Sequence, residues 1–136
     1  MTGLLLKIVD HRNELSRAGV LEVLRKKHVE RYDALRRMTA AAGELQHQAG
    51  HAVRGSRYVR TVVDQRLRDM RADSRRDSDL LGGELVQAVT AYTDVIASKL
   101  KEELEEPIQA VALEQIYQAW QALLKIIEKV GRTPVV

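Results

Sequence analysis

The sequence predicts an all-α protein, an antiparallel helical bundle with long coiled-coil-like helices and an amphipathic C-terminal helix. The composition is 45% hydrophobic and 30% charged, with no Phe, no Cys and two Pro, which is typical of helical bundles rather than β-sandwiches or disulfide scaffolds. From residue 21 onward, apolar residues recur at alternating spacings of three and four, the heptad pattern of packed helices. A chain of 136 residues fits one helical domain over residues 1–136.

The first helical region carries this heptad seam. The seam consists of Leu21, Leu24, His28, Leu35, Met38, Ala42, Leu45, Ala49, Ala52, Val59 and Val63. Its slots at Arg31 and Ser56 are polar. The pattern fits one long helix over residues 21–70 or two helices over 12–42 and 44–72, since Gly43 could end the first of two.

The second half of the chain predicts two more helices. Residues 73–79 are polar and lack a seam, so we expect a loop there, with Asp79 or Ser78 as the N-cap of a helix over 79–105. Pro107 ends that helix and suits the first turn of another, over 107–130. Gly131 is the expected stop signal.

The last predicted helix has a broad apolar face, which closes the bundle or pairs two chains. We expect partner contacts from Trp120, Leu123, Ile127 and Val130. The interpretation that follows is a non-catalytic helical interaction or scaffold protein that binds a protein partner and forms a homo-oligomer. No glycine-rich phosphate loop, nucleophile elbow or nucleotide fingerprint is present, so we expect neither an enzyme nor a cofactor.

Composition also narrows location and partners. The absence of cysteine excludes disulfides and thiol chemistry. Three leucines before Lys7 are too few for a signal-peptide core or a membrane span, so we expect a soluble, cytoplasmic protein without a transmembrane segment. Residues 1–76 hold 17 Lys/Arg against 9 Asp/Glu, and residues 77–136 hold 5 against 10. Such asymmetry favours a basic helix packed on an acidic one, or a nucleic-acid-binding face.

The stretch GHAVRGS, residues 50–56, is the one motif that indicates a specific chemistry. We expect His51, Arg54 and Gly55 on one solvent-facing strip, where a guanidinium could stabilise a phosphate on the imidazole. The run His51 to Ser56 resembles the motif of histidine-containing phosphotransfer domains, which are four-helix bundles. The resemblance covers six residues and departs from the family after Ser56. It implies that His51 accepts phosphate, that Arg54 stabilises it and that Gly55 admits a receiver domain.

Two further residue sets offer alternatives. Residues 54–76 are rich in arginine, and Arg57, Arg68, Arg71 and Arg75 lie near one helical face, an arrangement that could neutralise nucleic-acid phosphates. The interleaved aspartates indicate surface ion pairs instead. Glu44 and His47 have the spacing used twice in di-iron bundles, but it occurs once here, so no metal site is predicted.

Overall fold

The computed structural model describes residues 3–55, 57–101 and 104–133, with side chains from residue 22 onward except those of residues 24, 57 and 58. Five helices make up this part of the chain: α1 (Gly3–Val53), α2 (Arg57–Arg76), α3 (Ser78–Leu81), α4 (Gly83–Lys99) and α5 (Glu106–Arg132). No strand occurs in the described ranges. The predicted all-α fold class is therefore confirmed.

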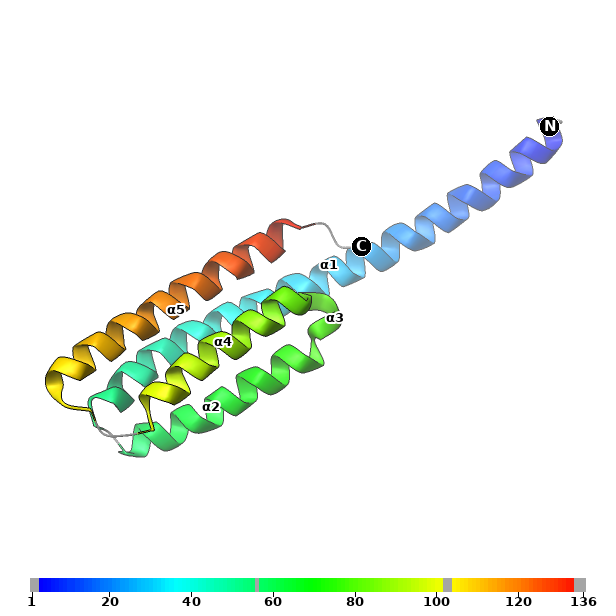
Figure 1. Cartoon of the computed structure of the whole chain (residues 1–136). Helices are drawn as coiled ribbons and strands as arrows, with labels where there is room; N and C mark the ends of the chain where they lie inside the picture. Colours follow the sequence, from blue (N-terminus) through cyan, green and yellow to red (C-terminus); the bar gives the residue numbers. More distant parts are fainter. Residues whose placement is uncertain (1–2, 56, 102–103, 134–136) are drawn as a thin grey trace.

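Four of the helices form the bundle, and its order follows the chain (Figure 1). The C-terminal part of α1 packs against α2, α2 against α4, α4 against α5, and α5 against α1 again. Consecutive long helices run antiparallel, as short connections require. The single turn of α3 connects α2 to α4 at one end of the bundle, where it contacts α1.

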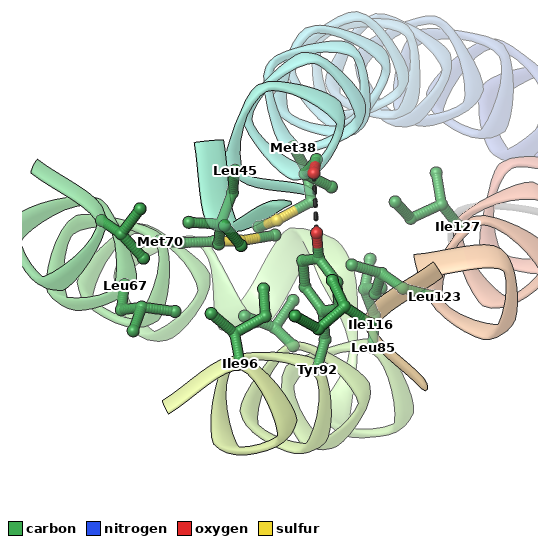
Figure 2. Packing of buried hydrophobic residues seen from close by; sticks show 14 of the residues in the cluster. Met38, Leu45, Leu67, Met70, Leu85, Tyr92, Ile96, Ile116, Leu123 and Ile127 are labelled. Carbon is green, nitrogen blue, oxygen red and sulfur yellow. Dashed lines mark hydrogen bonds between the residues drawn. The ribbon is translucent and has the colours of Figure 1, made fainter. Parts of the chain in front are cut away.

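The core confirms the seam over residues 35–52. Leu35, Met38, Ala42, Leu45, Ala49 and Ala52 are all buried on α1. Facing residues from α4 and α5 complete the cluster (Figure 2). Tyr92 points from α4 across the core, and its hydroxyl donates a hydrogen bond to the Ala42 carbonyl at 2.8 Å. The alanines of α1 leave room for this large side chain.

The break between the first two helices does not fall at Gly43. Helix α1 continues through that residue to Val53, and the turn comes at Arg54 and Gly55. A single glycine within a helix costs about 1 kcal/mol relative to alanine, and the buried contacts of Ala42 and Leu45 outweigh that cost. The two predicted helices 12–42 and 44–72 are thus α1 and α2, with their boundary displaced by about three helical turns.

The expected loop at residues 73–79 is shorter than predicted. Helix α2 extends to Arg76 because Met70 and Ser74 are buried on its inner face, and the Ser74 hydroxyl donates to the Arg71 carbonyl at 2.9 Å. Neither Ser78 nor Asp79 is an N-cap: Asp77 occupies the N-cap position of α3, without a capping hydrogen bond from its side chain. Gly82, with φ 84°, precedes α4.

The second connection also differs from the prediction. Helix α4 ends at Lys99 rather than near residue 105, and the carbonyl of the buried Leu100 accepts a hydrogen bond from Arg60 Nη1 at 3.3 Å. Pro107 lies in the first turn of α5, as expected. That helix continues past Gly131 to Arg132, because Thr133 caps it through its hydroxyl, which donates to the Lys129 carbonyl at 2.9 Å.

The N-terminal half of α1 projects beyond the bundle (Figure 1). Helix α1 has 51 residues and α5 has 27, or about 77 Å against about 40 Å at 1.5 Å per residue. Among the described side chains of α1, that of Arg31 is the first to be buried, and its Nη2 donates to the carbonyl of Thr133, the C-cap of α5. The bundle therefore ends at Arg31, and we call residues 3–30 the extension.

Candidate functional site

The extension is the most unusual surface of the molecule. Every described side chain from residue 22 to residue 30 is exposed, including Val23 at 54% and Val29 at 58%. The extension nevertheless contains the first seam residues, Leu21, Leu24 and His28. Seam residues with the same spacing are buried further along α1, inside the bundle. The sequence predicted that these residues pack within a helical bundle of the same chain. The His28 side chain is exposed, and those of Leu21 and Leu24 lie outside the described residues.

His51 lies in the last turn of α1 and is exposed. Its ring contacts that of His47, one turn earlier, edge to face with centroids 4.8 Å apart. Arg54 and Gly55 do not continue the helical strip expected for them. They form the turn after α1, in which the Gly55 N–H donates to the Ala52 carbonyl at 3.1 Å. Ser56 lies outside the described residues.

The two glycines of the GHAVRGS stretch each have a structural role. Gly55 has φ 108°, a conformation that residues with a side chain rarely adopt, so it permits the sharp turn into α2. At Gly50, an added Cβ would lie 3.5 Å from Leu113 Cδ2, so this residue lets α5 approach α1 closely. Neither glycine therefore requires a bulky partner as its explanation.

An open hollow of about 490 Å³ lies beside the two histidines, between α1 and α5. Gly50 forms part of its floor, and His47, His51 and Arg54 line its α1 side. Glu114 and Tyr117 line the opposite side. The hollow brings two imidazoles and a guanidinium together, a set of donors that suits an anion such as phosphate.

The apolar face of α5 is largely occupied within the chain. Leu123 and Ile127 have 1% and 8% of their surface exposed and belong to the bundle core, while Trp120 and Val130 are partly buried against it. These four residues were expected to bind a partner, whereas Leu123 and Ile127 contribute their side chains to the core of their own chain. Helix α5 closes the bundle because its face packs on α1 and α4.

The arginine face of α2 is partly neutralised. Arg71 donates to the Asp94 carboxylate at 2.6 Å and to the Thr93 hydroxyl at 2.7 Å. Arg66 pairs with Glu44 at 2.7 Å. Arg68 and Arg75 are exposed, and the Arg57 side chain lies outside the described residues. Interhelical ion pairing therefore explains part of the charge asymmetry between the two halves of the chain.

The described residues contain neither a metal-binding cluster nor a helix that could span a membrane. Among these residues, no group of three or more His, Asp or Glu side chains could hold a metal ion, and Glu44 is engaged by Arg66 rather than by His47. None of the described helices is both long enough and apolar enough to cross a membrane.

The evidence for function comes from the surfaces described above. No protein-family model, curated protein or solved structure matches this chain.

Proposed function

We propose that the chain is a helical interaction protein that self-associates through the extension, with the bundle as a stable head. The observation that carries the proposal is the projection of about 28 residues of α1 beyond the last residue that the bundle covers. An isolated helix has little intrinsic stability in water and normally depends on packing of an apolar face. A second copy would supply that packing.

The length and pattern of the extension support a second copy as the occupant. Residues 3–30 have the length of about four heptads, and Leu21, Leu24 and His28 place the seam spacing in their C-terminal part. Acidic and basic residues both occur along the extension, as expected for a helix paired with another protein helix rather than one lying on an anionic membrane, which carries a strongly basic polar face. The extension also continues the seam that is already a packing surface inside the bundle.

Light scattering or sedimentation equilibrium tests this proposal. We expect wild type to have a dimer mass and Leu24→Glu to be monomeric, because the substitution places a carboxylate in the seam. Val29→Glu is the matched control, since Val29 lies on the same part of α1 but off the seam and is 58% exposed. A monomeric wild type at its highest soluble concentration would contradict the proposal, as would equal loss of mass in both variants.

A second candidate function is phosphotransfer through His51. Three observations favour it: the bundle has four long helices, His51 is exposed, and Arg54 lines the same hollow. In this reaction a phosphoryl group would leave an aspartyl phosphate, with a new bond from phosphorus to an imidazole nitrogen and release of the ring proton to solvent. Arg54 would stabilise the phosphate by charge-assisted hydrogen bonds.

Phosphate incorporation tests the second candidate separately. Wild type, His51→Ala and His47→Ala are exposed to a small phosphodonor and to phosphorylated receiver domains. Acid-labile phosphate in wild type and His47→Ala but not in His51→Ala would support the relay. Absence of label in all three proteins would remove this candidate and leave self-association untouched.

A further inference from the structure

The bundle restricts how a second copy can lie against the extension. Helix α1 runs from the extension into the bundle without a break (Figure 1). From Arg31 to Ala52, the seam side of α1 is already covered by the other helices of the same chain. Thr133, at the end of α5, meets α1 at Arg31. The space beside the seam is therefore open along the extension and closed beyond it.

A parallel pair is incompatible with this arrangement. If a second α1 lay beside the seam in the same direction, it would continue past Arg31 into the volume that α5 fills. Its own bundle would overlap the first α1 for the same reason. Packed helices need about 8–10 Å between their axes, so the two bundles could not occupy these positions together.

An antiparallel pair meets no such obstacle. Building on the self-association proposed above, we infer that two copies pair antiparallel through their extensions, with the two bundles at opposite ends of a two-helix rod. In that arrangement each bundle lies beyond the N-terminal end of the other copy's extension. The open side of each extension is then covered by the other.

The sequence of the extension has the matching twofold pattern. Leu6 and Leu24 are equidistant from position 15, as are Val9 and Leu21. Asn13 and Arg17 lie between these two pairs. The six positions follow one another at intervals of three or four residues, the spacing of one helical face. Antiparallel pairing about position 15 therefore sets apolar positions against apolar positions near both ends and polar positions against each other at the centre.

The end of the bundle has a space where the second copy would arrive. A hollow of about 370 Å³ lies there, lined by Lys27, Arg31, Leu80, Gly82 and Val130 among others. Pairing about position 15 brings residues near Gly3 of the second copy beside Lys27. The N-terminal end of the second copy's extension would then reach the edge of this hollow.

Distances between spin labels test the orientation. The chain has no cysteine, so Val23→Cys and Val29→Cys each give one label per copy at an exposed site. At 1.5 Å per residue, antiparallel pairing about position 15 predicts separations of about 24 Å for position 23 and about 42 Å for position 29. The difference of about 18 Å is the same in any antiparallel register whose centre lies on the N-terminal side of position 23.

The outcomes separate this inference from the proposed function. Two short and similar separations, in a protein with dimer mass, would overturn the antiparallel arrangement and leave self-association intact. A monomer mass without dipolar coupling would overturn both. Light scattering on each labelled protein shows whether the label itself disrupts the pair.

Discussion

At the scale of single residues, the hydrogen bond of Tyr92 is the most informative contact of the core. Tyr92 is 2% exposed, and its hydroxyl reaches the carbonyl of Ala42 on the diagonally opposite helix. We expect Tyr92→Phe to lower the free energy of unfolding by about 1 kcal/mol, the usual net value of one buried hydrogen bond. Urea denaturation measures the change. Tyr117→Phe is the control, since Tyr117 is 45% exposed and should change stability by less than about 0.5 kcal/mol.

The same residue gives the bundle a dependence on alkaline pH. Burial raises the pKa of the Tyr92 hydroxyl above its ordinary value, so the folded state holds this proton more tightly than the unfolded state. The stability it contributes is complete below the unfolded pKa of about 10 and is lost as the pH rises above it. Tyr92→Phe should therefore flatten the decline in unfolding free energy above about pH 10. An equal decline in both proteins would contradict this assignment.

At the scale of elements, two glycines of α1 and its following turn should respond to alanine in opposite directions. An added Cβ at Gly43 meets nothing within 4 Å, and the backbone is helical. Gly43→Ala should therefore stabilise the protein by about 0.5–1 kcal/mol. Gly55 has φ 108°, so Gly55→Ala strains the turn and should cost about 1 kcal/mol or more. Thermal unfolding of both variants checks the signs. Destabilisation by Gly43→Ala would show that α1 is not continuous there.

These two positions show how far the sequence predicts the elements. Heptad spacing predicted the buried face of α1 correctly from Leu35 to Ala52, because a helical face is set by local periodicity. Glycine content could not locate the helix end, because Gly43 and Gly55 look alike in sequence. Which of them ends α1 depends on where α2 finds its packing partners, and Val53 and Val63 are both buried beside the later position.

The candidate site was predicted only in part, and for a related reason. The exposure of His51 followed from its position opposite Ala49 and Ala52. The turn conformation of Arg54 and Gly55 did not, because the expected helix ran through them. The extension was not predicted, since Leu24 outside the bundle and Leu35 inside it belong to the same heptad register. Heptad spacing indicates that one face of a helix packs against another helix. The lengths of the other helices in the chain decide whether that second helix comes from the same chain or from another.

At the scale of the whole molecule, self-association couples the folding of the extension to protein concentration. The extension projects from the bundle, and its described side chains from residue 22 to residue 30 are exposed, so it should fray when the second copy dissociates, while the bundle keeps its own core. We expect helical circular dichroism to fall on dilution by up to about a fifth, the share of the chain that the extension represents. The fluorescence of Trp120, which is packed against the core, should stay constant. Leu24→Glu should have the lower helical signal at every concentration, and Val29→Glu should follow wild type. A signal independent of concentration, in a protein shown to dissociate over the same range, would mean that the extension is helical on its own and that pairing does not stabilise it.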